Sequence, residues 1–327
     1  PAIGFSIPIG DEPDTPWRFG LAAYGVSGLG VDYRDTALDN PGFYNFGGGM
    51  AAPAMAGEYT QLSIMKFAPS LAYRISSQWS VGLAVHIDYG MLDLRSGTSS
   101  GFAFGLQPGI IYKPSLNWSL GLTYISPQEV DHKNVLDFDQ DGISDDLKLE
   151  APQQLAIGVG YDFLGSDLLI EGNVRWINWS SANGYDDFDW DDQWVFAIGA
   201  QYSPTEKLDL RIGYNYGKNP VKAHDGFDGS LNPMTGMPNS VNNIQGKILP
   251  SYYYETFRII GFPAIVENHI TFGASYTVTD KIILSLGYVH AFEKTMTEEG
   301  TNLFGQPVTL ESTLSENSLE FGFTYRF

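Results

Sequence analysis

Residues 318–327, at the end of the chain, alternate between large apolar side chains and small or polar ones. Successive side chains of a β-strand point to opposite faces, so this alternation predicts a strand with one apolar face and one polar face. Such a strand fits a barrel wall with lipid outside and a polar lumen inside, although the last strand of a soluble β-sandwich has the same pattern. The apolar face consists of Leu319, Phe321, Phe323, Tyr325 and Phe327, and the other face of Glu320, Gly322, Thr324 and Arg326.

The same two-residue period recurs in residues 79–89, 118–124, 208–216 and 282–288. Many of these apolar faces begin or end with Trp or Tyr, the side chains that form girdles at both interfaces of a membrane barrel. The sequence contains no apolar run of about 18 residues, so we expect no transmembrane helix. We therefore predict an all-β fold, a transmembrane antiparallel β-barrel.

Composition agrees with this class. The 327 residues include 37 Gly, 19 Tyr and 20 Phe, which suit tight turns, a crowded lumen and a lipid-facing surface. The net charge of −20 argues against nucleic acid as a partner, because nucleic acid requires a basic face. There are 0 Cys residues, which is compatible with an oxidising periplasm but does not by itself identify the compartment.

The connections alternate between short turns and longer polar segments, as the two ends of an outer-membrane barrel require. The longer segments cover roughly 30–58, 93–100, 126–152, 178–192, 218–267 and 293–316. Single-chain bacterial barrels have even strand numbers, so a count of about thirteen suggests that one strand precedes this sequence or that the count is off by one. The predicted strands cover residues 1–9, 17–28, 60–76, 79–94, 101–113, 117–126, 152–163, 167–178, 193–203, 207–217, 267–277, 281–292 and 317–327.

Five segments, taken in order along the chain, resemble the FadL-type outer-membrane transporter family, which imports long-chain fatty acids and related hydrophobic compounds. They are residues 71–83, 109–112, 149–154, 175–180 and 323–327. The resemblance implies a fourteen-stranded barrel plugged by an N-terminal hatch. It also implies that residues 1–327 form a single outer-membrane barrel without the hatch and the first strand.

The resemblance further implies a route of transport. The hydrophobic molecule is captured at the outer face, enters a pocket, and leaves sideways through an opening in the wall. The expected partners are a hydrophobic small molecule and outer-membrane lipid, with the protein a monomer in the Gram-negative outer membrane. In the family the opening arises from an inward kink in the third strand, which corresponds here to Gly25, Gly28 and Gly30. Glycine adopts backbone angles that interrupt a ladder, although a glycine-rich strand end leading into a loop has the same sequence.

Candidate substrate-binding residues are apolar side chains on the otherwise polar inner face, of which Ile283 and Val289 are examples. A carboxylated substrate also needs a cation, and Arg95 is the nearest match to a basic pocket position of the family. Two departures of this sequence from the family's pattern favour a neutral hydrocarbon over a fatty acid as the substrate. The loop after Arg95 is short, and the run 185–192 is acidic and would repel carboxylates.

The segment 137–145 has carboxylates at alternate positions followed by a glycine, which suits Ca²⁺ because this ion binds several oxygens at close range. An EF-hand would need Glu at the twelfth position, where Lys148 stands instead, so a structural calcium loop of another kind is expected. The alternative is an acidic turn without metal. The proposed ligands are Asp137, Asp139, Asp141, the carbonyl of Ile143, and Asp145.

Two other function classes remain open at this stage. A passive outer-membrane porin would need an open polar lumen and a charged constriction. A barrel enzyme of the lipase or protease type would need a nucleophile beside a base, and His86 and Asp88 share a strand face without any serine motif. We therefore expect transport without catalysis, and no cofactor apart from the structural calcium ion.

Overall fold

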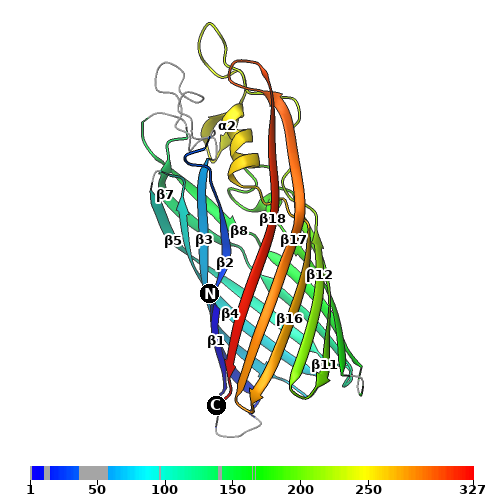
Figure 1. Ribbon diagram of the computed structural model, residues 1–327. Coiled ribbons are helices and arrows are strands. Elements are labelled where there is room, and N and C mark those ends of the chain that lie inside the picture. The colour runs from blue at the N-terminus through cyan, green and yellow to red at the C-terminus, as the bar shows by residue number, and fades with distance from the viewer. Residues whose placement is uncertain are drawn as a thin grey trace.

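The computed structural model describes residues 2–10, 15–36, 58–95, 97–138, 142–163, 165 and 167–327. Thirteen long strands form the wall of an elongated barrel (Figure 1). These strands are β1 (Ala2–Pro8), β2 (Trp17–Asp32), β3 (Tyr59–Arg74), β4 (Trp79–Asp93), β5 (Thr98–Tyr112), β6 (Trp118–Ile125), β9 (Gln154–Phe163), β10 (Leu168–Ile177), β11 (Gln193–Thr205), β12 (Leu208–Gly217), β16 (Asn268–Thr279), β17 (Ile282–Thr301) and β18 (Pro307–Tyr325).

Each wall strand pairs antiparallel with the next in the order β1-β2-β3-β4-β5-β6-β9-β10-β11-β12-β16-β17, and β18 pairs with β17. This order confirms the predicted strands and their meander topology. Short turns lie at the end of the barrel where the C-terminus is found, and the longer connections lie at the opposite end, the mouth (Figure 1). None of the helices in the described part of the chain is long and apolar enough to cross a membrane.

The outer surface of the wall is apolar. Phe321 is 80% exposed, and Leu319, Phe323 and Tyr325 are also exposed on the same face of β18. Their partners on β17 include Leu284 and Leu286, which are exposed on that face too. No second sheet covers these side chains within the described residues, so the prediction that the apolar face of the last strand points away from the barrel is confirmed.

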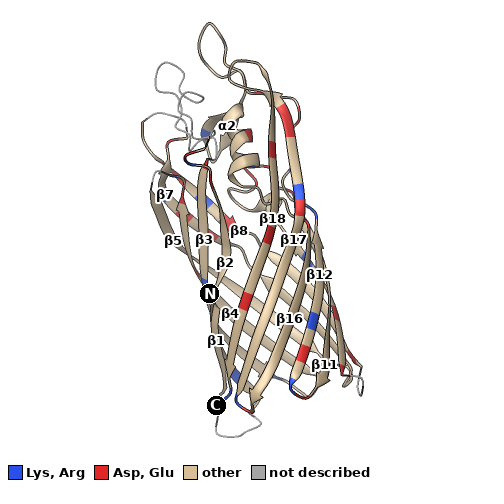
Figure 2. Cartoon of the chain, in the orientation of Figure 1, with Lys and Arg blue, Asp and Glu red and all other residues tan. Residues whose placement is uncertain are grey.

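Aromatic pairs line the end of the barrel that carries the short turns. Trp79 stacks on Tyr112 with ring centroids 4.1 Å apart, and Trp118 packs against Tyr161 at 4.7 Å. These are directly opposed cross-strand pairs, as predicted for an interfacial girdle. Much of the wall is uncharged, although β18 carries acidic segments along its middle (Figure 2).

Two long connections differ from the predicted polar loops. Most of 293–316 continues the ladder of β17 and β18, which meet in a turn over 302–306. Segment 126–152 forms a hairpin of β7 (Gln128–Leu136) and β8 (Asp145–Ala151) that packs against β5. Glycines make this packing possible: a Cβ at Gly105 would lie 2.6 Å from the Gln128 side chain.

The remaining elements close the mouth. They include η3 (Trp179–Ser181), β13 (Phe227–Asp228), β14 (Val241–Ile244), β15 (Lys247–Pro250), α2 (Ser251–Thr256) and η4 (Phe257–Gly261). The largest buried apolar cluster combines side chains of these elements with inward residues of the wall. The core of the molecule therefore lies at its mouth.

Candidate functional site

Helix α2 and the π-helical turn η4 form a plug, residues 251–261, in the barrel mouth (Figure 1). Every residue of the plug is buried. The Thr60 hydroxyl on β3 donates to the carbonyl of Gly261 at 2.6 Å, and the Ser312 hydroxyl on β18 donates to that of Ile259 at 2.5 Å. The wall thus satisfies carbonyl groups at the C-terminal end of the plug, where the helix has no partners of its own.

A small apolar cavity of about 20 Å³ lies against the plug, and we call it the aromatic pocket. This volume holds about one water molecule, so a larger molecule fits only if the lining moves. The Phe188 ring packs on Phe257 with centroids 5.2 Å apart and on Tyr254 at 5.8 Å. The ring of Trp190 packs at 4.9 Å from Tyr185. The pocket is lined by Leu147, Leu149, Tyr185, Phe188, Trp190, Phe257, Arg258 and Phe262.

The acidic run 185–192 supplies one wall of this pocket. Its backbone turns at Gly184 and Asp189, both of which have positive φ. The aromatic side chains of Phe188 and Trp190 are thereby buried, with exposed fractions of 7% and 5%. The predicted acidic run therefore also forms an aromatic wall of the pocket, because its aromatic side chains point inward and the acidic side chains between them do not.

Arg258 is the charged residue of the pocket lining, and its guanidinium is fully engaged. Its Nε donates to the Phe188 carbonyl at 2.8 Å, and Nη2 donates to the Lys222 carbonyl at 2.5 Å. Nη1 lies 2.5 Å from Glu255 Oε2 and 3.3 Å from Glu298 Oε1. Arg258 therefore stabilises the protein's own carboxylates and carbonyls and has no free face for a ligand carboxylate.

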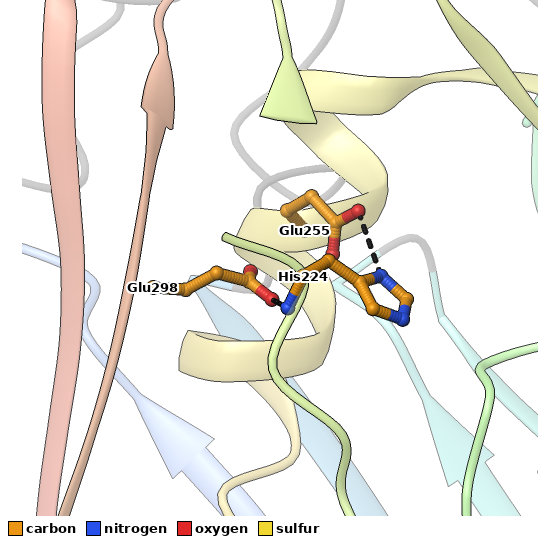
Figure 3. Close-up of side chains that lie close together, drawn as sticks. All are labelled: His224, Glu255 and Glu298. Carbon is orange, nitrogen blue, oxygen red and sulfur yellow. Dashed lines mark hydrogen bonds and ion pairs between the residues drawn. The ribbon is translucent and has the colours of Figure 1, made fainter. Parts of the chain in front are cut away.

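Within the described residues, one group of side chains has the spacing of metal ligands: His224, Glu255 and Glu298, whose ligand atoms lie within 4.8 Å of one another (Figure 3). The Nη1 atom of Arg258 lies 3.0 Å from Nδ1 of His224 and also contacts both carboxylates. A guanidinium thus occupies the place that a metal ion would need. The hydrogen bond to Glu255 raises the pKa of the His224 imidazole above its usual value.

The predicted substrate-binding residues do not come together. Arg95 has positive φ just beyond the end of β4 and pairs with the buried carboxylate of Glu58. Ile283 and Val289 lie half-buried on β17, opposite Thr277 and Thr271 of β16. None of the three lines the aromatic pocket.

The predicted kink residues lie on β2, whose ladder with β3 runs from Trp17 to Asp32. The ladder has one register shift, between Gly25 and Ser27, which leaves Val26 as an extra residue in a β-bulge. Gly28 and Gly30 keep their partners on β3. The irregularity of this strand is therefore local and adjoins Gly25.

Of the predicted calcium ligands, Asp139 and Asp141 lie outside the described residues. Asp137 accepts a hydrogen bond from the Gly142 amide at 2.8 Å. Asp145 accepts one from the Phe138 amide at 3.0 Å and lies 2.5 Å from Nζ of Lys247. Ile143 is 68% exposed. The calcium site stays a prediction.

A buried polar cluster on the inner wall was not predicted. Lys66 Nζ lies 2.7 Å from Gln128 Oε1, 3.0 Å from Nδ1 of His86 and 3.4 Å from Asp88. It ties hairpin β7–β8 to β3 and β4. His86 and Asp88 thus belong to a structural network with a lysine. The sequence signal was the pair of glycines at 101 and 105, where β7 approaches the wall.

A family model described as outer membrane protein transport protein (OMPP1/FadL/TodX) matches residues 93–226. No curated protein matches the chain. The fold is similar to the toluene transporter TodX of P. putida, with a TM-score of 0.64 and 14% identity over 99% of this chain and 82% of that one. It is also similar to a FadL homologue of Pseudomonas aeruginosa, with a TM-score of 0.62 and 14% identity over 99% and 77% of the two chains.

Proposed function

We propose that this protein is a FadL-type transporter of hydrophobic compounds in the Gram-negative outer membrane, and that it captures small uncharged hydrophobic molecules in the aromatic pocket. The observation that carries the proposal is the apolar lining beside the plug. Burying apolar surface stabilises a complex by roughly 25 cal/mol per Å². A pocket of aromatic rings at the mouth therefore supplies a driving force that a polar pore lacks.

The charges around the pocket support an uncharged substrate. Arg258 is saturated by Glu255, Glu298 and backbone carbonyls. Arg95 pairs with Glu58. The acidic run 185–192 forms part of the pocket wall and repels anions. These features favour a hydrocarbon over a fatty-acid carboxylate.

We further propose that the molecule leaves sideways through the wall near the β2 bulge. The lumen beyond the mouth contains a cavity of about 440 Å³ whose lining includes Glu171, Asn173, Gln201 and Arg211. The charged groups of Glu171 and Arg211 lie in this cavity beside apolar residues such as Leu169, whereas an exit into lipid would meet no charged group. The bulge beside Gly25 is the irregular point of the β2–β3 ladder. Separating the two strands should therefore need the least free energy there.

Binding to the purified full-length protein tests the capture step. Titration with an uncharged monoaromatic compound should change the fluorescence of the pocket tryptophan Trp190. The corresponding benzoate should bind much more weakly, because its carboxylate would lie unpaired beside an acidic wall. Equal binding of the two compounds would contradict the proposed substrate class, and no binding of either would contradict the pocket.

A further inference from the structure

The plug is held by a cluster of charged groups from four parts of the chain. Glu255 and Arg258 belong to the plug, Asp189 to the run 185–192, Glu298 to β17, and His224 to the segment that precedes β13. The backbone amide of His224 also donates to Glu298. His224 is therefore the point at which the plug, the pocket wall and the barrel wall are joined (Figure 3).

Charge balance in this cluster depends on the imidazole. Glu255 and Glu298 are both buried, and the cation that faces the two of them is Arg258. Lys222 lies on the other side, 2.5 Å from Asp189 and 3.2 Å from Asp191. Burial, and then the neighbouring Glu255, raise the pKa of Glu298 to about 7, so both carboxylates are charged only toward alkaline pH. There a neutral His224 leaves two buried carboxylates with one guanidinium, and an uncompensated buried charge is strongly destabilising. At lower pH a protonated His224 adds a positive charge that faces Glu255 and Asp189.

The hydrogen bonds of His224 also change with protonation. As a cation it donates from Nδ1 to Glu255 Oε1 at 3.1 Å and from Nε2 to Asp189 Oδ2 at 2.9 Å. As a neutral ring it has one N–H, so one of these two bonds is lost. In that form Nδ1 can accept from Arg258 Nη1 at 3.0 Å, so His224 then shares the Nη1 donor with Glu255, which lies 2.5 Å from it.

We propose that His224 is a proton-dependent latch, which in its protonated form holds the plug closed over the aromatic pocket and in its neutral form releases it. The charged and titratable groups that face the imidazole are Asp189, Glu255, Arg258, Glu298 and the Tyr254 ring, stacked at 6.3 Å. The plug also contains a π-helical turn, a geometry frequently found at functional sites.

The direction of the pH effect follows from linkage. The hydrogen bond to Glu255 raises the pKa of His224 in the closed plug above 6.5. Protonation therefore stabilises the closed state, and this contribution is complete below about pH 6.5 and is lost as the pH rises through the raised pKa. The inference rests on the proposed function in taking the pocket as the capture site, but it concerns the opening of the plug itself.

Amide hydrogen exchange of residues 251–261 in the purified full-length protein tests the latch, after correction for the intrinsic pH dependence of exchange. Protection should fall several-fold between about pH 5 and about pH 8. His224→Gln should give low protection that does not change with pH. His290→Gln is the matched control, because His290 contacts Asn317 away from the cluster, and it should behave like the wild type.

Three results would overturn the latch. The first is amide protection of residues 251–261 that does not depend on pH in the wild type. The second is a pH dependence that survives in His224→Gln and disappears in Glu298→Gln, and the third is full protection restored at about pH 8 by Ca²⁺ or Zn²⁺ alone. The last would mean that His224, Glu255 and Glu298 bind a metal. If His224→Gln fails to fold, Asp189→Asn replaces one of the two carboxylates that face the imidazole by a neutral amide and should lower the midpoint of the transition. If the protein binds the aromatic probe but the protection of the plug does not depend on pH, only the latch is contradicted. If the protection depends on pH but the probe does not bind, only the proposed function is contradicted.

Discussion

Arg258 donates its Nε proton to the carbonyl oxygen of Phe188 at 2.8 Å, and both residues line the aromatic pocket. Arg258 belongs to the plug, and Phe188 belongs to the opposite wall of the pocket. One hydrogen bond therefore fixes the two sides relative to each other. The carboxylate of Glu255, in the preceding turn of the plug, holds the guanidinium in this position at 2.5 Å.

Arg258→Met should open the plug. The substitution keeps much of the side-chain volume but leaves Glu255 and Glu298 buried without their cation, which typically costs about 3–5 kcal/mol. Amide exchange of residues 251–261 should accelerate strongly. Arg211→Met is the control, because Arg211 is 43% exposed in its ion pair with Asp209, and exposed pairs contribute about 0–1 kcal/mol. Unchanged exchange in Arg258→Met would show that packing alone holds the plug.

Phe188→Ala should weaken binding of a neutral aromatic ligand about tenfold or more, because the ring forms one wall of the pocket and burying such a ring contributes about 1.5–3 kcal/mol. Fluorescence titration measures this affinity. Phe104→Ala is the control, since Phe104 is 68% exposed on the outer face of β5. A similar loss of affinity in both variants would place the ligand elsewhere or indicate general destabilisation.

The wall of the barrel was predictable from sequence for a physical reason. Lipid outside and a polar lumen inside impose a strict two-residue period, and residues 318–327 and 79–89 show it directly. The outer parts of β17 and β18 escaped prediction because their outward face is polar, unlike that of the membrane-facing wall. Thr295 faces Thr313, and Thr297 faces Glu311. The apolar residues there, such as Met296 and Leu310, belong to the buried core at the mouth.

The plug could not be predicted in the same way. All of its side chains are buried, so residues 251–261 show no apolar stripe, and the run Tyr252, Tyr253 and Tyr254 within a polar loop was the visible signal. Its stability comes from distant partners: Phe188 lies 70 positions from Arg258, and Thr60 lies 201 positions from Gly261. Such pairings depend on the curvature of the whole wall and leave no local pattern.

The calcium prediction has its own test. Calorimetric titration with Ca²⁺ should show binding to the wild type, with ligand oxygens about 2.3–2.6 Å from the ion in a structure determined with calcium. The double variant Asp139→Ala with Asp141→Ala should lose this binding. Asp162→Ala, at a short turn of the opposite end, serves as the control. Equal affinity in the double variant and the wild type would remove the site.

Gly28→Val tests the sideways exit. A Cβ at Gly28 has no neighbour within 4 Å, so the variant should fold, whereas a Cβ at Gly30 would lie 2.5 Å from the Thr60 carbonyl oxygen. Valine favours a regular pleated strand and should make the wall next to the bulge harder to open. Uptake of a hydrophobic compound should fall while binding in the pocket survives. Undiminished uptake in the folded variant would favour an axial route through the lumen.

The central claim is that this barrel transports uncharged hydrophobic molecules, and uptake by intact cells tests it most directly. Cells that express the complete gene should take up a radiolabelled monoaromatic hydrocarbon faster than cells without it. Uptake of a labelled long-chain fatty acid should rise little, and uptake of a small sugar should not rise. A rise for the sugar alone would identify a passive porin and contradict the account, as would a fatty-acid rate that exceeds the hydrocarbon rate.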